Sequence, residues 1–488
     1  MDLISYRGPG VAGGVSSGLG AVWVGQQETQ SRWYYINKEV FEMRQSDQQR
    51  SKFLAMLPEA MIDGHYRYCN EFIWPIMHDL PEHASYNVDQ HYHYNAFNKL
   101  IAEQIDVESP GSNKHFVQDY QLALTPQWLN LHGHHSVVFW HIPWPKNVPD
   151  EFVEPIKEIA LGLLGADAVG FHTDEYAKNF QQFVGKHIRN HRVIPQAMSI
   201  INESQAWPPF MNKSTRMGHK AFVMQEPNFV PRHSNVCRLV VHPLGIDFKY
   251  WQDMSETPIA EETRSSLDSL TNCDFILSVD RVDYTKAVFD RILIIDRFFR
   301  DNPELVGKVT FAQVSGRSRA GLPAFDKYWT DCKALHASLN NTWKTEDWQP
   351  LVWIDQALKP SDLAYLYRHA KALMVNAVRD GLNLTAKEYV ACQENNPGVL
   401  LLSPGAGAWD ELGEYALPTH PKKKEEAVQS ILQALTMPLW ERHQKSLKMK
   451  TSIAGNQLTH WWDRFSQIAH APMPAALEDV HTKPAQLG

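Results

Sequence analysis

The stretch VRDGLNLTAKEYV (residues 378–390) follows directly on the apolar run ALMVNA (372–377). The apolar run predicts a buried strand, and the residues after it predict a helix. Gly381 allows a tight turn between the two, and the first N–H groups of the helix, near residues 382–384, have no partner within the helix. A strand that passes through such a turn into a helix N-terminus can bind an anion. The alternative is an ordinary strand–turn–helix without a ligand.

The same alternation of short apolar runs and helical patterns continues along most of the chain. It is typical of an α/β protein with parallel sheets and crossover helices. Helices are predicted at 152–165, after Thr173 as N-cap, at 288–301 and at 361–372. The alternation restarts near 244–250, so we expect two doubly wound halves. Strands are predicted at 3–6, 115–120, 136–142, 168–171, 274–279, 308–315, 350–355, 372–377 and 398–403.

These patterns predict two domains, residues 1–245 and 246–455. The first carries a polar, irregular insertion at about 187–236, with a hairpin expected around KAFVMQ (220–225). The aromatic helix predicted at 460–470 needs a partner surface, so residues 456–470 are expected to return to the first domain. The Pro- and Ala-rich segment 471–488 is expected to fray.

The composition narrows the class of protein. The 488 residues carry a formal net charge of −8, which argues against nucleic-acid binding through phosphate contacts. The five cysteines are scattered without a C-x-x-C pair, so neither structural zinc nor a disulfide framework is expected. No apolar run approaches the roughly 20 residues of a membrane span, and no signal peptide is recognisable. We expect a cytoplasmic protein that contacts no membrane; whether it forms a homo-oligomer stays open.

Further polar residues follow predicted strands, at the sheet edge where open α/β sheets bind ligands. In SVDRVDYTK (278–286), Arg281 and Lys286 could clamp a diphosphate and stabilise it as it leaves. A solvated charge pair is the alternative. His141, in FWHIPWP (139–145), could bond a sugar hydroxyl or, more simply, a backbone carbonyl.

The N-terminal loop YRGPGVAGGVSSGL (6–19) is a fourth candidate. Arg7 leaves the first strand, and Gly13 and Gly14 allow close approach of backbone to a ligand. The loop lacks the G-x-G-x-x-G pattern, so a nicotinamide-binding fold is poorly supported. The histidine-rich stretches 90–95 and 132–135 lack a known metal-ligand spacing, so no metal site is expected.

Taken in order, these landmarks resemble the trehalose-6-phosphate synthase family. These are retaining glucosyltransferases of family 20 and of GT-B fold, a group that also includes glucosylglycerol-phosphate synthases. The resemblance implies two Rossmann-like, doubly wound domains facing a cleft, and it extends over nearly the whole chain. The shared landmarks are AGG (12–14), WP (74–75), DYQL (119–122), HIPWP (141–145), GFHTDEYAKNF (170–180), PLGID (243–247), DRVDYTK (280–286) and RDGLNLTAKEYV (379–390).

The resemblance also implies roles for individual residues, divided between a donor half and an acceptor half. In the donor half, cations and backbone would hold a diphosphate, Glu388 a ribose, and Asp380 with His141 a glucose. The implied donor-binding residues are Gly14, His141, Arg281, Lys286, Asp380, Leu382, Asn383, Leu384, Thr385 and Glu388. The implied acceptor-binding residues are Arg7, His65, Trp74, Asp119 and Arg319. The implied catalytic residues are Arg281, Lys286, Asp119 and His141.

The reaction implied by the resemblance moves glucose from a nucleoside-diphosphate-glucose to a phosphorylated acceptor, with retention and without a metal or other cofactor. The leaving phosphate oxygen could take the proton of the acceptor, so no side-chain base is required. Glucose 6-phosphate is the expected acceptor, and the product would be trehalose 6-phosphate. The base of the nucleotide is not determined by the sequence.

Three residues depart from the family pattern, and two of them, Gln26 and His65, lie on the acceptor side. Gln26 stands near the usual position of a Trp, His65 stands near that of a Tyr, and Ala287 replaces a Gly. Glycerol 3-phosphate, as in the glucosylglycerol branch, therefore stays open as acceptor, and HIPWP (141–145) also resembles pseudoglycosyltransferases. A sugar-phosphate sensor without turnover is the alternative from another class.

Overall fold

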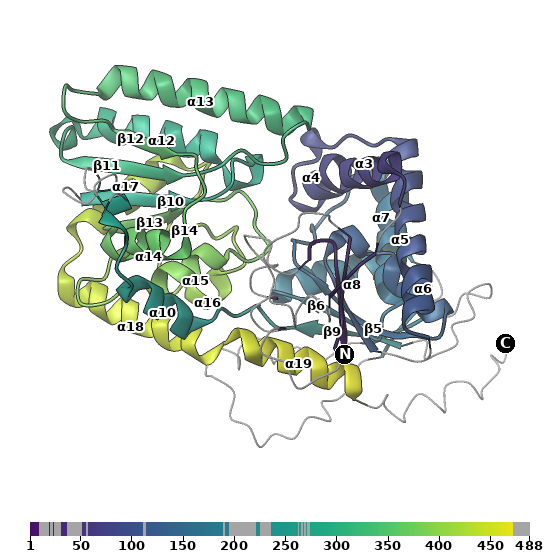
Figure 1. Ribbon diagram of the computed structural model, residues 1–488. Coiled ribbons are helices and arrows are strands. Elements are labelled where there is room, and N and C mark those ends of the chain that lie inside the picture. Colours follow the sequence, from purple (N-terminus) through teal and green to yellow (C-terminus); the bar gives the residue numbers. More distant parts are fainter. Residues whose placement is uncertain are drawn as a thin grey trace, which may run out of the picture.

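The computed structural model describes residues 1–8, 19, 23, 31–36, 51–54, 57–110, 114–188, 191–194, 221–224, 236–261, 263–264, 267, 270 and 274–471. Two α/β units stand beside each other, and the helix α19 (Leu458–His470) runs from the second unit along the first (Figure 1).

The first unit is built on a sheet in which nine described strands take the order β3-β2-β1-β4-β5-β6-β9-β8-β7. The strands from β3 to β9 are parallel, whereas β8 is antiparallel to β7 and β9. The hairpin expected around residues 220–225 is therefore confirmed. The strands are β1 (Asp2–Ser5), β2 (Trp33–Tyr35), β3 (Ser51–Phe53), β4 (Lys114–Gln118), β5 (His135–Trp140), β6 (Ala168–Phe171), β7 (His191–Ile194), β8 (Ala221–Met224) and β9 (Val236–Val241).

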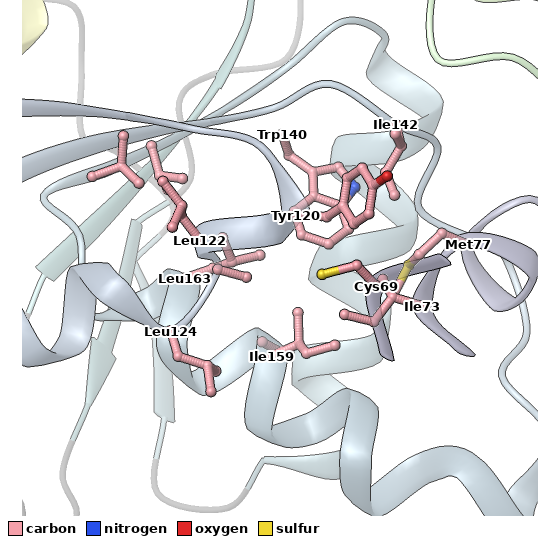
Figure 2. Close-up of a cluster of buried hydrophobic side chains, with 14 of the residues drawn as sticks. Cys69, Ile73, Met77, Tyr120, Leu122, Leu124, Trp140, Ile142, Ile159 and Leu163 are labelled. Atoms are coloured by element: carbon pink, nitrogen blue, oxygen red, sulfur yellow. The ribbon is translucent and has the colours of Figure 1, made fainter. Parts of the chain in front are cut away.

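Alternate residues of these strands enter two different cores, as the two-residue period of a strand requires. Ile4, Val117 and Val138 pack under the helices on one face, whereas their neighbours pack against α19 on the other. Figure 2 shows part of the first core, where Tyr120 and Trp140 lie close to Cys69 and Ile73. The helices of this unit are α3 (Glu59–Arg67), a π-helix (Tyr68–Ile73), α4 (Trp74–Met77), α5 (Val88–Glu108), α6 (Thr125–Leu131), α7 (Val153–Leu164) and α8 (Asp174–His187).

The second unit contains a parallel sheet of six described strands in the order β12-β11-β10-β13-β14-β15. Apolar cores cover both faces of this sheet, as expected for a doubly wound domain. The strands are β10 (Asp274–Val279), β11 (Val309–Val314), β12 (Leu351–Ile354), β13 (Ala372–Val375), β14 (Val399–Leu402) and β15 (Leu417–Pro418). The helices include α10 (Phe248–Glu256), α12 (Val288–Asp301), α13 (Pro323–Trp343), α14 (Pro360–His369), α15 (Leu384–Ala391), α16 (Trp409–Leu412), α17 (Lys424–Thr436) and α18 (Leu439–Gly455).

Within the described residues the chain passes between the units at two places, and these two crossings lie side by side. Ile246 of the first crossing forms a parallel bridge with Gln457 of the second, and the Leu458 N–H donates to the Ile246 carbonyl (3.3 Å). The Asn456 amide donates to the Pro243 carbonyl (3.2 Å). A Cβ on Gly245 would lie 2.3 Å from the Asn456 carbonyl oxygen, so this close approach requires glycine.

The helix α19 packs its aromatic face against the first sheet, as the sequence predicts for residues 460–470. The ring of Phe465 lies 5.3 Å from that of Phe116 and 5.1 Å from that of Phe139. Gly170 on the neighbouring strand makes room, since a Cβ there would lie 2.6 Å from Phe465. No helix in the described part of the chain is long and apolar enough to cross a membrane.

We expect Phe465→Ala to lower the free energy of unfolding by about 3 to 5 kcal/mol, because it leaves a cavity between α19 and the sheet. Urea denaturation followed by tryptophan fluorescence measures the change. Gln467→Ala, at an exposed position of the same helix, is the control and should change stability by less than about 0.5 kcal/mol. Equal stabilities of the two variants would contradict the packing described for α19.

Candidate interdomain site

The carboxyl ends of strands from both sheets meet at the junction of the two units. Backbones approach each other closely here: a Cβ on Gly381 would lie 2.0 Å from the carbonyl oxygen of His141. The hydroxyl of Tyr176 donates to the Asp380 carbonyl (2.8 Å). Arg379 adds an ion pair with Glu175 (2.5 Å). The turn after β13 is thus held directly against the end of β5.

The turn at residues 380–384 leads into α15, which begins at Leu384, where the sequence predicts a helix start. Asn383 adopts φ +83°, and its side-chain oxygen accepts from the Ala386 N–H (3.0 Å). Asparagine tolerates such a left-handed conformation better than most residues. The N–H groups of Leu384 and Thr385 lie in the first turn, where no intrahelical acceptor exists. Together with the helix dipole they form a site for an anion.

Lys286 and Asp380 form an ion pair at this turn, and Asn383 donates a second hydrogen bond to the same carboxylate (3.0 Å). Burial alone would raise the pKa of Asp380. The Lys286 ammonium and the Asn383 amide outweigh that effect and lower the pKa below its usual range. The carboxylate is therefore ionised and fixes the position of the ammonium group.

At the junction the guanidinium group of Arg281 lies within electrostatic range of those of Arg7 and Arg319. Although Arg281 is exposed, partial desolvation by the surrounding protein and repulsion from Arg319 and Arg7 lower its pKa. Arg319 is neutralised by a buried ion pair with Asp283, whereas Arg7 and Arg281 make no ion pair with any described residue. Such an excess of positive charge favours an anionic ligand.

Trp74 and Arg319 come together as the sequence predicts, although they lie in different units. The guanidinium carbon of Arg319 lies 4.0 Å from the centre of the Trp74 ring, and its Nε donates to Asn70 (2.5 Å). The Trp74 indole N–H donates to Asp283 (3.4 Å). Asp283 therefore ties one aromatic and one cationic residue of the predicted acceptor half together.

Asp119 stands directly after β4 in a strained backbone conformation, with φ +69°. Its carboxylate accepts from the His141 N–H (3.1 Å), which couples the ends of β4 and β5. Burial raises the pKa of Asp119 to about 7. A strained, perturbed carboxylate at a strand end is typical of a functional site.

The ring of His141 takes part in a chain of buried hydrogen bonds. The Leu244 N–H donates to Nδ1 of His172 (3.3 Å), so the proton of neutral His172 lies on Nε2. That proton is donated to Nδ1 of His141 (3.3 Å), and Nε2–H of His141 donates to Gln118 (2.8 Å). Burial lowers the pKa of His141 to about 3, so the ring is neutral. Both ring nitrogens bond protein groups, and a sugar could reach them only by replacing one of these bonds.

Glu388 lies one turn inside α15 and is half-buried. The hydroxyl of Tyr367 donates to its carboxylate (3.2 Å), while burial raises its pKa to about 7. Leu382, by contrast, contributes backbone: its carbonyl accepts from the Ala408 N–H (2.6 Å) and its side chain is buried.

The structure does not bring His65 to the surface of this site. The ring is fully buried, stacks on Phe97 at 3.7 Å, and bonds the Gln121 carbonyl (2.8 Å). The next residue, Tyr66, is half-buried and acts electrostatically on Arg319. A π-helix follows at Tyr68–Ile73, and a π-turn rotates the preceding residues relative to Trp74.

Two of the predicted positions lie outside the residues that the structure describes, and two residues of the site were not predicted to take part in it. Gly14 and Gln26 lie outside the described residues. Asp283 lies within a quoted motif, but the sequence gives no sign that it bonds Trp74, 209 residues away. Tyr176 was likewise quoted without a role. Among the described residues, no group of three or more His, Cys, Asp or Glu side chains could hold a metal ion.

The comparisons with known proteins begin with a family model. The model of glycosyltransferase family 20 matches residues 12–471. The chain belongs to this family. It is 29% identical over 470 residues to a bifunctional trehalose-6-phosphate synthase/phosphatase of Thermoproteus tenax, covering 93% of this chain and 58% of that protein. It is 27% identical to a UDP-forming α,α-trehalose-phosphate synthase of Candida albicans, covering 95% and 93%. The chain thus spans little more than half of the Thermoproteus relative.

Solved structures show the same fold. An α,α-trehalose-phosphate synthase of Burkholderia xenovorans in complex with glucose-6-phosphate aligns with TM-score 0.82 and 25% identity, covering 96% of this chain and all of that chain. An Escherichia coli trehalose-6-phosphate protein bound with UDP-2-fluoro glucose aligns with TM-score 0.81 and 23% identity, covering 97% and 100%. The predicted α/β, GT-B architecture is confirmed.

We expect Gly381→Ala to separate the two units, because the new Cβ would meet the His141 carbonyl at 2.0 Å and neither backbone can give way cheaply. Small-angle scattering should show an increased radius of gyration, and activity should be lost. Gly316→Ala is the matched control, since the nearest atom to its Cβ would lie 3.7 Å away. An unchanged radius and activity for Gly381→Ala would contradict the contact described at the junction.

Proposed function

We propose that the protein transfers glucose, with retention, from a nucleoside-diphosphate-glucose to glucose 6-phosphate and so forms trehalose 6-phosphate. The observation that carries this proposal is the group of Arg7, Arg281 and Arg319 at the junction, beside the ionised Lys286–Asp380 pair. The reaction has two phosphorylated participants, and both need cationic partners. Relatives named as UDP-forming synthases, and a related structure that contains glucose-6-phosphate, support UDP-glucose and this acceptor.

In the proposed complex the diphosphate of the donor lies against the first turn of α15 and between Arg281 and Lys286. These groups stabilise the charge that develops as the glycosidic bond to phosphate breaks. The leaving phosphate oxygen takes the proton of the attacking acceptor hydroxyl, so no side-chain base acts. Rate enhancement comes from orientation and from charge stabilisation. The reaction as proposed uses no metal ion.

The predicted site residues divide accordingly. Asp380 binds the donor glucose and holds Lys286 in place, and Glu388 binds the ribose. Arg7, Trp74 and Arg319 bind the acceptor. His141 and Asp119 act by positioning, because the His141 N–H bonds Asp119 while its carbonyl lies against Gly381.

The function is tested by measuring nucleoside diphosphate release over a grid of substrates. The donors are UDP-, ADP- and GDP-glucose; the acceptors are glucose 6-phosphate, glycerol 3-phosphate and none. We expect release that depends on glucose 6-phosphate and on UDP-glucose, with and without EDTA. Release that depends on glycerol 3-phosphate would instead identify a glucosylglycerol-phosphate synthase. This alternative acceptor fits the departure at His65, whose ring is buried away from the site. Binding without any release would identify a sensor.

Arg281→Ala and Lys286→Ala should each lower turnover by about 100- to 1,000-fold, the cost of removing one donor that stabilises a developing anion. The readout is kcat for UDP release. Arg297→Ala removes an exposed arginine that pairs with Asp301 on α12 and should leave kcat unchanged. Wild-type turnover in both junction variants would overturn the assignment of the diphosphate site.

The raised pKa of Glu388 predicts a pH dependence of nucleotide binding. A carboxylate accepts hydrogen bonds from both ribose hydroxyls, whereas the protonated acid accepts less well. Since the pKa is about 7 in the free protein, the affinity for UDP should rise about tenfold from pH 6 to pH 8. Calorimetric titration measures it. Glu388→Gln should retain only the pH dependence of UDP itself; equal pH slopes for both proteins would contradict the role of Glu388.

A further inference from the structure

His78 is a buried histidine at the junction that no motif of the sequence singles out. It caps the end of α4, and only 1% of its surface is exposed. Its Nδ1 lies 2.7 Å from the Trp74 carbonyl oxygen. Because a carbonyl only accepts, Nδ1 carries the proton. Burial lowers the pKa of His78 to about 4, so the ring is neutral and Nε2 presents a lone pair. No hydrogen bond from a described residue reaches that nitrogen.

The surroundings of His78 lie on both sides of the junction. Its ring packs on the Trp74 ring at 4.0 Å, and the Trp74 indole donates to Asp283 of the second unit. The charges that act on the imidazole are those of Asp283, Asp380 and Lys286, all from the second unit. His78 therefore packs on Trp74 of the first unit and is acted on by the charges of Asp283, Asp380 and Lys286 of the second.

His369 provides an internal comparison for this arrangement. Its Nδ1 also bonds the carbonyl of an aromatic residue four positions earlier, Tyr365 (2.8 Å), and its ring packs on that residue at 4.2 Å. His369, however, is exposed at the end of α14. The local cap alone therefore does not require burial among ionised groups. At His78 the acceptor nitrogen instead belongs to a ring that is acted on by ionised groups of the junction, where a bound sugar could supply a donor.

We propose that Nε2 of His78 accepts a hydrogen bond from a hydroxyl of a sugar bound between Trp74 and the Lys286–Asp380 pair. This inference rests on the proposed glucosyl transfer and adds a substrate-binding residue to it. The shared chemistry is a pyranose hydroxyl, which belongs either to the donor glucose or to the acceptor. Neutral imidazole suits this task because it accepts a hydrogen bond without adding a charge between Lys286 and Asp380.

The test pairs variants of His78 with substrates that lack single hydroxyl groups. His78→Leu removes the acceptor atom, and His78→Gln retains one in the side-chain oxygen. Each protein is assayed for kcat/KM with monodeoxy forms of UDP-glucose and, separately, of glucose 6-phosphate. His369→Leu is the matched control. Thermal unfolding of each variant verifies that it is folded.

We expect His78→Leu to lower kcat/KM about three- to twelve-fold, the size of one lost neutral hydrogen bond. One deoxy substrate should lower kcat/KM of the wild type by a similar factor and cost His78→Leu nothing further. The substrate that shows this non-additivity identifies the hydroxyl and tells donor from acceptor. His78→Gln should stay within about threefold of the wild type and keep its sensitivity to that substrate.

Two results would overturn the inference. One is additivity of His78→Leu with every deoxy substrate, and the other is a folded His78→Gln variant that behaves like His78→Leu. Failure of the proposed function is a separate outcome. It would appear as a wild-type protein that releases no nucleoside diphosphate with any acceptor, before any variant is compared.

Discussion

The contact between the Gly381 backbone and the His141 carbonyl sets the geometry of the whole junction. A Cβ on Gly381 would meet the His141 carbonyl, so the end of β5 and the turn after β13 approach through main chain, and Tyr176 and Arg379 hold the turn from the side. The ion pair of Lys286 with Asp380 stands on one side of this contact, and the carboxylate of Asp119, bonded to the His141 N–H, on the other. The neutral histidines near this contact hold their neighbours in place without adding charge. The electrostatic potential of the site is therefore set by the charged groups.

Those charged groups are divided unevenly. Asp283 neutralises Arg319 and Asp380 neutralises Lys286, and both carboxylates also bond neutral donors that hold them in place. Arg7 and Arg281 make no ion pair among the described residues, so the junction as a whole favours anions. Each carboxylate therefore serves the site indirectly. It fixes the direction of a cation that would otherwise be mobile on a long side chain, and this reduces the entropy lost when a phosphate binds.

Much of the fold could be predicted from the sequence because buried parallel strands are continuous apolar runs. The predicted strands at 274–279 and 168–171 coincide with β10 and β6, and the turn at Asp380 lies where the pattern places it. Strands of two or three residues, such as β2 and β15, have no recognisable period and were missed. His65 was expected on the acceptor side from the family resemblance, but its ring is buried and bonds the Gln121 carbonyl. Bonds such as that of Trp74 with Asp283 depend on tertiary structure and leave no local pattern.

The paired crossings at Ile246 and Gln457 affect how recombination could exchange parts of this chain. Residues from Phe248 to Gly455 leave the first unit and return to it at neighbouring points, so the second unit is a continuous insert in a domain that is completed by α19. Domains inserted in this way can be exchanged without rerouting the host. Recombination at these two positions could therefore combine the first unit with different second units, each inserted as one continuous segment.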